Sequence, residues 1–443
     1  MEQQWRAPAG RQIIIIALAS STPLAPWQKS LNCSGLLLRP ESPQQNIMNV
    51  TNTKSDFNLA NVATYGNAFI AHANAKRHKK HYASIKEFEK NLPENLHKLV
   101  DEFAAGTYRT GEYTLDTVND SGKVREIAKV GYRDRVAQWM IANYYQPYLG
   151  EVFSAHSHAA IVKKGIHTAL RETEHYVRTE GYTHCYKFDI RKYFPHVNRA
   201  VLKSQTDSDT DDEILRMILR GMVDDAPGDD GIPIGNYLSQ FLANRYLTPF
   251  DKWLESKGIP FVRYMDDVCI FGNSFEELRK IARDVEWFLM SELYLEIKPN
   301  WQIFRIADRG VDFVGYRVFP DRTILRRDIF ARMRRKVRRV KRMVKAGGVF
   351  TESMQSTLMS YLGWIAPCTE STRWCIYDKY FAEVLELAGV KLTKRLARAY
   401  LWRERHTEQE CRQPIQTQTT DQDGPTQSKS TQTSLFGTPI FGS

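Results

Sequence analysis

The clearest hydrophobic pattern lies in the middle of the chain, where apolar stretches end on acidic side chains. Two short apolar runs, 259–262 and 268–271, flank the adjacent carboxylates of Asp266 and Asp267. This pattern predicts a β-hairpin with its charges at the turn. A further strand is predicted over residues 183–190, and it carries a single acid near its end.

Apolar periodicity elsewhere predicts a mixed fold of helices and strands. Residues 86–103 place an apolar side chain every three or four positions, which is typical of an amphipathic helix. The segment 326–345 does the same, with an apolar stripe between basic residues. The other predicted elements are helices over 134–149 and 275–295, strands over 123–130 and 311–319, and helical structure over 351–403.

The same pattern divides the chain into four parts. Residues 1–57 are expected to be an extension outside the fold, and translation starting at Met48 is an open alternative. A polar tail rich in Gln and Thr over 404–443 is expected to be disordered. Between them, residues 58–325 are predicted to form the main region of helices and strands, and residues 326–403 a basic helical region.

Charge and cysteine content narrow the class of protein. The chain has 443 residues, a net charge of +11 and a pI near 9.2, which favours a polyanionic partner. Eleven of the Lys and Arg residues fall within 326–345, which contains one acid. The six cysteines form no CxxC pair, as expected for a protein of the reducing cytoplasm. No apolar run reaches the length of a transmembrane helix, so no membrane association is expected.

The acids in the predicted strands indicate metal-dependent phosphoryl chemistry. Asp266 and Asp267 repel each other in an apolar hairpin, so keeping both ionised requires a counter-charge. Mg²⁺ suits this role because it binds carboxylate oxygens and leaves positions for substrate phosphates. Asp189 on one strand, with Asp266 and Asp267 on a neighbouring hairpin, meets the need of two-metal nucleotidyl transfer for bridging carboxylates.

These segments resemble the palm motifs of reverse transcriptases, namely an F-D-[I/V]-x-x-x-F/Y strand followed by a Y-x-D-D hairpin. The resemblance implies an α+β right-hand polymerase, with fingers and palm (an antiparallel sheet plus helices) over 58–325 and a helical thumb over 326–403. It implies that Asp189, Asp266 and the carbonyl of Ile190 hold two Mg²⁺ ions, for which Mn²⁺ can substitute, and that Asp267 completes the acidic set. It also implies that Lys298 protonates the leaving pyrophosphate.

The resemblance extends to residues that would contact the nucleotide. Lys123 and Arg125 match the fingers motif that grips the triphosphate, where a guanidinium can meet phosphate oxygens in two places. Phe194 matches the aromatic ring that excludes a 2′-hydroxyl. Ile234 and Gly235 occupy the second nucleotide-pocket motif. The alternative for Lys123 and Arg125 is an ordinary charged strand end. The alternative for Phe194 is a core side chain.

Further matches concern the primer and the template. Gly315 and Tyr316 resemble the primer grip, in which a glycine lets the backbone approach the primer end. The basic residues of 326–345 are expected to contact phosphates. Arg334, Arg335 and Arg338 are the predicted primer or template contacts. The run Arg133-Asp134-Arg135 is consistent with either template contact or a structural ion pair.

One departure points to a subfamily. Residues 231–240 carry Ile234 where most reverse transcriptases have Gln, and Gln240 where they have Pro. An isoleucine cannot hydrogen-bond near the incoming nucleotide, so a permissive site is expected. This version resembles the enzymes of diversity-generating retroelements, which implies errors at template adenines, an RNA template, a DNA or RNA primer, dNTPs, and a basic pentameric accessory protein.

Two alternatives remain open at this point. Residues 155–165 lack the S-Y-A-x-R form of that subfamily, and an antiviral reverse transcriptase with its own noncoding RNA would share the palm. A maturase-like RNA-binding scaffold with a vestigial site is the other, although the complete acidic set argues against it. His156, His158 and His167 are interpreted as surface residues rather than metal ligands.

Overall fold

The computed structural model describes residues 53–79, 81–120 and 123–392. Most of the predicted amino-terminal extension, including Met48, lies outside the described residues, as do residues 393–403 of the basic helical region and the whole of the predicted tail. Residues 54–57 were expected outside the fold, but Phe57 is fully buried and stacks on Tyr145 at a ring-centroid distance of 4.5 Å. The packed part therefore begins earlier than predicted, because this aromatic ring fills the core.

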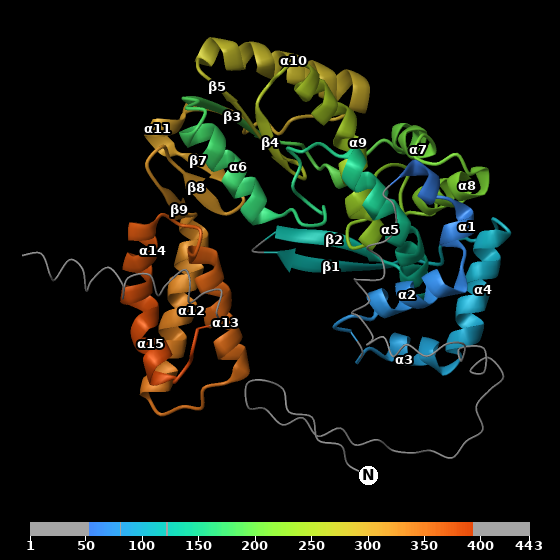
Figure 1. Cartoon of the computed structure of the whole chain (residues 1–443), viewed down its shortest axis with the longest axis horizontal. Coiled ribbons are helices and arrows are strands. Elements are labelled where there is room, and N and C mark those ends of the chain that lie inside the picture. The colour runs from blue at the N-terminus through green and yellow to red at the C-terminus, as the bar shows by residue number, and fades with distance from the viewer. Residues whose placement is uncertain (1–52, 80, 121–122, 393–443) are drawn as a thin grey trace, which may run out of the picture.

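The first part of the fold is a group of helices with a two-stranded ribbon (Figure 1). Its elements are η2 (Lys54–Asp56), α1 (Leu59–Val62), α2 (Tyr65–Ala75), α3 (Ala83–Lys90), α4 (Leu92–Ala104), β1 (Thr114–Asp120), β2 (Lys123–Lys129) and α5 (Tyr132–Val152). The single helix predicted over 86–103 is wrong. Asn91 has non-helical dihedral angles, and Pro93 stands in the first turn of α4, where its ring and missing N–H prevent one continuous helix.

The centre of the fold is a four-stranded antiparallel sheet with the order β4-β5-β3-β6. The elements of this region are α6 (Ile166–Arg178), β3 (His184–Asp189), η3 (Phe194–His196), α7 (Arg199–Asp207), α8 (Glu213–Asp224), α9 (Tyr237–Ser256), β4 (Phe261–Tyr264), β5 (Asp267–Gly272), α10 (Phe275–Leu293), β6 (Gln302–Arg305) and α11 (Ile306–Arg309). The predicted strand and hairpin are confirmed, and they are hydrogen-bonded neighbours.

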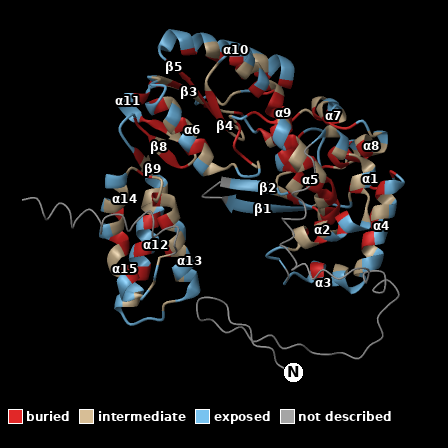
Figure 2. Cartoon of the chain, in the orientation of Figure 1, coloured by how far each residue is buried: buried red, intermediate tan, exposed pale blue. Residues whose placement is uncertain are grey.

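Most residues of β4 and β5 and half of those of β3 are buried (Figure 2), and an apolar cluster covers each face of the sheet. One face carries Phe188 and Ile270, which pack with residues of α5, α9 and α10 in the larger apolar cluster. The other carries Cys185, Cys269 and Phe271, which pack with residues of α6, β8 and α12. Alternate side chains of a strand point to opposite faces, so Lys187 and Asp189 share the face of Cys185. Cys185 and Cys269 are fully buried, as expected for small core residues.

The last part is a small sheet followed by helices. Its elements are β7 (Val311–Phe313), β8 (Tyr316–Val318), β9 (Thr323–Leu325), α12 (Arg327–Lys345), α13 (Glu352–Ile365), α14 (Glu370–Ile376), a π-helical turn η4 (Tyr377–Phe381) and α15 (Ala382–Leu387). The single strand predicted over 311–319 is wrong, because positive φ angles at Val314 and Gly315 turn the chain back into a hairpin. In the view of Figure 1, the β1–β2 ribbon lies between these last helices and α2–α4. None of the described helices is long and apolar enough to cross a membrane.

Candidate active site

The predicted acids lie at one end of the central sheet. β3 and β5 run antiparallel, and their register pairs Asp189 with Asp267. Asp266 stands in the tight turn between β4 and β5, and the N–H of Ile190 donates to its carbonyl oxygen over 3.2 Å. Three acids that are far apart in sequence therefore meet at one sheet end, which is what the two strand patterns predicted.

Two lysines divide these acids into a pair and a single carboxylate. The ammonium of Lys298 lies 3.5 Å from Asp189 Oδ1 and 3.9 Å from Asp266 Oδ2. The backbone N–H of Lys298 donates to the carbonyl of Asp189 over 2.9 Å, which fixes its place. Lys187 Nζ instead lies 2.6 Å from Asp267 Oδ1. Asp189 and Asp266 thus share one cation, whereas Asp267 has its own.

This arrangement modifies the predicted metal set. In the part of the chain that the structure describes, no three His, Cys, Asp or Glu side chains form a ready metal site. Asp267 is turned to Lys187, so Asp189 and Asp266 are the two carboxylates that already hold a common positive charge. A pair of carboxylates around one cation fits a Mg²⁺ ligand set, which is completed by substrate phosphates and water.

The electrostatics favour a bound cation at this place. Burial raises the pKa of Asp266, and the charge of Asp189 adds to this, while Lys298 and Arg125 oppose it. Burial also raises the pKa of Asp267 to about 6, against the attraction of Lys187. Desolvated carboxylates with raised pKa values gain most from a positive charge of higher valence.

The β1–β2 ribbon is tied to the predicted nucleotide-pocket motif. The N–H of Ala128 on β2 donates to the carbonyl of Ile234 over 3.0 Å. Gly235 has a φ of +111°, and a Cβ there would lie 3.6 Å from the Ala128 oxygen, so the two segments run in close contact. Arg125 is exposed on the same strand, and its charge acts on Asp266. Lys123 begins β2 at the ribbon tip.

Phe194 supports the other end of that motif through its backbone. Its carbonyl accepts from the N–H of Ile232 over 2.9 Å, and its side chain is partly exposed. Gly231 has a φ of +83°, and a Cβ there would lie 2.6 Å from the Pro195 oxygen, so only glycine fits. Phe194, Ile234 and Gly235 therefore belong to one loop assembly.

A basic cavity that the sequence analysis did not predict lies beside Gly235. It has a volume of about 340 Å³, and its lining includes Arg77, Lys79 and Arg135. Asn236, only 5% exposed, also lines it, and its Oδ1 has no hydrogen-bond partner in the described part of the chain. Two motifs noted in the sequence contribute to this cavity, the one with Arg135 and the one with Gly235 and Gln240.

Arg133 and Arg135, from the run Arg133-Asp134-Arg135, have different surroundings. Arg133 donates to Asp134 over 2.7 Å and forms a second ion pair with Glu102. The partly buried Arg133 therefore makes the structural ion pair that was one of the two interpretations. Arg135 instead reaches the cavity, where a template contact stays a prediction.

The predicted primer-grip residues Gly315 and Tyr316 pack against the helices that follow them. Gly315 has a φ of +90°, and a Cβ there would lie 2.8 Å from both Ile329 and Trp364. The ring of Tyr316 is fully buried, and its hydroxyl donates to the Trp364 carbonyl over 2.9 Å. Helix packing thus accounts for the glycine, and the tyrosine side chain is inaccessible to a primer.

The basic helix α12 presents one apolar and one charged side. Met333, Val337 and Val340 are buried, as predicted for its stripe. Arg334, Arg335 and Arg338 are exposed, so the three predicted phosphate contacts all reach the surface.

Comparisons with known proteins agree with this geometry at the level of the family. Residues 117–318 match the reverse transcriptase (RNA-dependent DNA polymerase) family. A search of curated proteins gives no match.

Solved structures with a similar fold are distant. Apo telomerase from Candida tropicalis is 10% identical, with a TM-score of 0.40 over 69% of this chain and 65% of that chain. A Sicinivirus 3Dpol RNA-dependent RNA polymerase is 13% identical, with a TM-score of 0.44 over 69% of this chain and 71% of that chain. A chain of a partial Cas6-RT-Cas1–Cas2 complex is 20% identical, with a TM-score of 0.32 over 53% and 42%.

The chain spans 53% to 65% of the length of the solved telomerase chains that it matches. The family match over 117–318 covers the central sheet with all three acids. Residues 117–318 therefore match a reverse transcriptase domain, the domain of RNA-dependent DNA polymerases.

Proposed function

We propose that this protein makes cDNA from an RNA template by two-metal nucleotidyl transfer and misincorporates opposite template adenines, as in a diversity-generating retroelement. The observation that carries the polymerase part is that the carboxylates of Asp189 and Asp266 lie close enough to share the Lys298 ammonium, at the end of two paired strands. In this proposal residues 58–325 are the fingers and palm, and 326–403 the thumb.

Asp189 and Asp266, with the Ile190 carbonyl, would hold two Mg²⁺ ions. When bound, these ions supply a lowered pKa for the primer 3′-hydroxyl and neutralise charge on the triphosphate. Lys187 forms an ion pair with Asp267, so the charge of this third acid is already neutralised and its carboxylate is held in place. Lys298, whose ammonium lies 3.5 Å from Asp189, would donate its proton to the leaving pyrophosphate.

Arg125 and Lys123 would bind the triphosphate from the ribbon. Arg125 is exposed and acts electrostatically on Asp266, which supports its placement over the reacting phosphates. Phe194 would exclude a 2′-hydroxyl. The exposed α12 residues Arg334 and Arg335 would contact the phosphates of the RNA and its primer.

The mutagenic part depends on Ile234. The Ala128–Ile234 hydrogen bond holds this residue against β2, where a glutamine amide could reach the nucleotide and an isoleucine cannot. With one polar contact fewer, the site discriminates less between nucleotides. A basic accessory protein is the expected partner in this setting.

Sequencing cDNA made from a defined RNA tests this proposal. We expect Mg²⁺-dependent synthesis with errors concentrated at template adenines, and fewer such errors in the Ile234→Gln variant. Uniform, low error at all four bases would reject the mutagenic part. Protection of cells against phage by the intact gene, without such errors, would favour the antiviral alternative.

A further inference from the structure

A fully buried ion pair, Arg263 with Asp251, links β4 to α9 beside the β4–β5 turn. Arg263 is the third residue of β4, and Asp251 lies on α9; both side chains are 0% exposed. Arg263 Nε donates to Asp251 Oδ1 over 2.7 Å and Nη2 donates to Oδ2 over 2.5 Å. The guanidinium is thus held in a two-point contact that fixes its plane.

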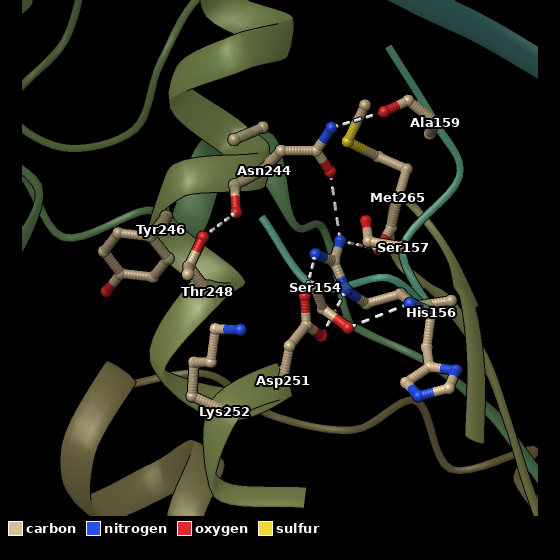
Figure 3. A network of polar contacts seen from close by, with 12 residues as sticks. Ser154, His156, Ser157, Ala159, Asn244, Tyr246, Thr248, Asp251, Lys252 and Met265 are labelled. Carbon is tan, nitrogen blue, oxygen red and sulfur yellow. Dashed lines mark hydrogen bonds and ion pairs between the residues drawn. The ribbon is translucent and has the colours of Figure 1, made fainter. Parts of the chain in front are cut away.

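The remaining nitrogen of this guanidinium reaches the turn. Nη1 of Arg263 donates to the carbonyl oxygen of Met265 over 2.9 Å and to Asn244 Oδ1 over 3.1 Å. Asn244 and Asp251 are seven residues apart on α9, so they lie on the same helix face. Asn244 in turn donates to the carbonyl of Ala159 over 2.5 Å. Figure 3 shows Asn244, Asp251, Met265 and Ala159 in one network of polar contacts.

The turn needs such support. Met265 has a φ of +59°, a conformation that costs a non-glycine residue free energy and persists only where its surroundings enforce it. The Met265 carbonyl belongs to the peptide bond that leads into Asp266. On the other side of Asp266, its own carbonyl accepts from Ile190. Both peptide groups beside the catalytic carboxylate are therefore fixed.

The backbone of Arg263 is fixed as well. Its N–H donates to the His156 carbonyl over 2.9 Å, and its carbonyl accepts from the N–H of His158 over 3.0 Å. The two histidine rings both pair with Glu172 on α6. The interpretation of these histidines as surface residues is wrong, because they secure the segment that flanks β4.

Stability alone does not explain this pair. Burying two charges costs several kcal/mol of desolvation, and apolar residues of similar size often serve a core equally well. Only a planar fork can hold Asp251, Asn244 and the Met265 carbonyl at the same time. The geometry therefore points to a task at the turn.

We propose that Arg263 is a positioning residue for nucleotidyl transfer, which holds the Met265 peptide so that the carboxylate of Asp266 stays beside that of Asp189. This inference rests on the proposed function only for the reaction, because the positioning itself can be measured without it. It adds Arg263, Asp251 and Asn244 to the residues on which the site depends.

A second buried pair on the same helix supplies a matched control. Arg245 on α9 pairs with Asp209 over 2.9 Å, with side chains 10% and 1% exposed. Arg245 donates onward to the Gln205 carbonyl and to Ser208, near the end of α7, and makes no hydrogen bond to the β4–β5 turn among the described residues. Loss of this pair removes a buried ion pair and the acceptor of the Tyr145 hydroxyl, and it leaves the turn alone.

The test compares two double variants, Arg263→Met/Asp251→Leu and Arg245→Met/Asp209→Leu. Apolar replacements avoid leaving one buried charge alone, so both variants are expected to fold. Thermal unfolding verifies this. Arg263→Lys serves as a second probe, because it keeps the charge but loses the planar fork.

The first readout is Mn²⁺ affinity without nucleic acid, measured by electron paramagnetic resonance. We expect the Arg263 double variant and Arg263→Lys to bind Mn²⁺ about 10-fold more weakly, in the direction of Asp266→Asn, and the Arg245 variant to bind like the wild type. The second readout is primer extension on RNA. We expect kcat about 100-fold lower in the Arg263 variants, with more Mg²⁺ needed for half-maximal rate.

Folded Arg263 variants with wild-type Mn²⁺ affinity and wild-type Mg²⁺ dependence would overturn the positioning role. Equal losses in both double variants would overturn it too, since the effect would then be one of general stability. If the wild type makes no cDNA while the Mn²⁺ difference persists, the proposed function fails and the positioning role stands.

Discussion

At the scale of single residues, the site is a set of carboxylates whose charges are balanced by particular lysines. Burial is the largest cause that raises the pKa of Asp267, and Lys187 only partly offsets it. An acid whose pKa is raised on folding favours the folded state while it is protonated. Its contribution is complete below its unfolded pKa near 4 and is lost as the pH rises through about 6.

This sign gives a testable pH dependence for the metal-free protein. In EDTA, we expect the unfolding temperature of the wild type to fall relative to that of Asp267→Asn as the pH rises from 4.5 to 7. The change corresponds to roughly 2–3 kcal/mol, because about 1.4 kcal/mol accompanies each pKa unit. Asp224→Asn, at an exposed pair with Lys203, serves as the control and should keep the wild-type slope. A constant gap between wild type and Asp267→Asn would contradict the raised pKa.

The acids were predictable at this scale, and their partners were not. Asp189 and Asp266 could be located because each ends an apolar strand pattern, and such patterns are local in sequence. Lys187 also lies in the predicted strand, but its pairing with Asp267 depends on register between strands 80 residues apart. Arg263 stood in the predicted hairpin too. Its burial depends on Asp251 from α9, which no local pattern indicates.

At the scale of elements, the turn between β7 and β8 joins the small sheet to the last helices. Gly315 faces Ile329 on α12 and Trp364 on α13, and its positive φ disfavours any other residue. The strand predicted over 311–319 failed because its apolar alternation continues through this turn. The conformation of Gly315 depends on packing against helices that follow later in the chain.

Gly315→Ala should therefore destabilise the protein by about 1–3 kcal/mol, since the new methyl group meets two side chains and the backbone becomes strained. Gly363→Ala is the matched control, because a Cβ there meets nothing within 4 Å in a helix interior. Denaturant unfolding measures both. Equal stability of the two variants would show that the packing around Gly315 is not tight.

The exposed arginines of α12 provide a prediction about nucleic-acid binding. Replacing Arg334 and Arg335 with Ala should weaken binding of an RNA–DNA hybrid and reduce the salt dependence of log K by about 2, because each arginine is expected to neutralise one phosphate. Arg279→Ala/Lys280→Ala on α10 removes the same charge from another exposed helix surface. Fluorescence anisotropy across salt concentrations measures the slopes. The same reduction in both double variants would indicate a general charge effect instead of direct phosphate binding by α12.

At the scale of the whole molecule, segments distant in sequence converge on one sheet end. The β1–β2 ribbon reaches it through Ile234, and α9 supports it from behind through Asp251. The general fold class could be predicted, because the strand and hairpin motifs and the basic helix occur in the order of a right-hand polymerase. The basic cavity beside Gly235 could not, because its cations come from the segment after α2 and from α5.

Primer extension on a defined RNA template, with Asp189→Asn and Asp266→Asn beside the wild type, tests the central claim most directly. We predict cDNA synthesis by the wild type only with a divalent metal. Each variant should lose about 10³-fold or more in rate while keeping its unfolding temperature, because several kcal/mol of transition-state stabilisation depend on the metal ligands. A folded Asp189→Asn protein that extends the primer at the wild-type rate would contradict the account.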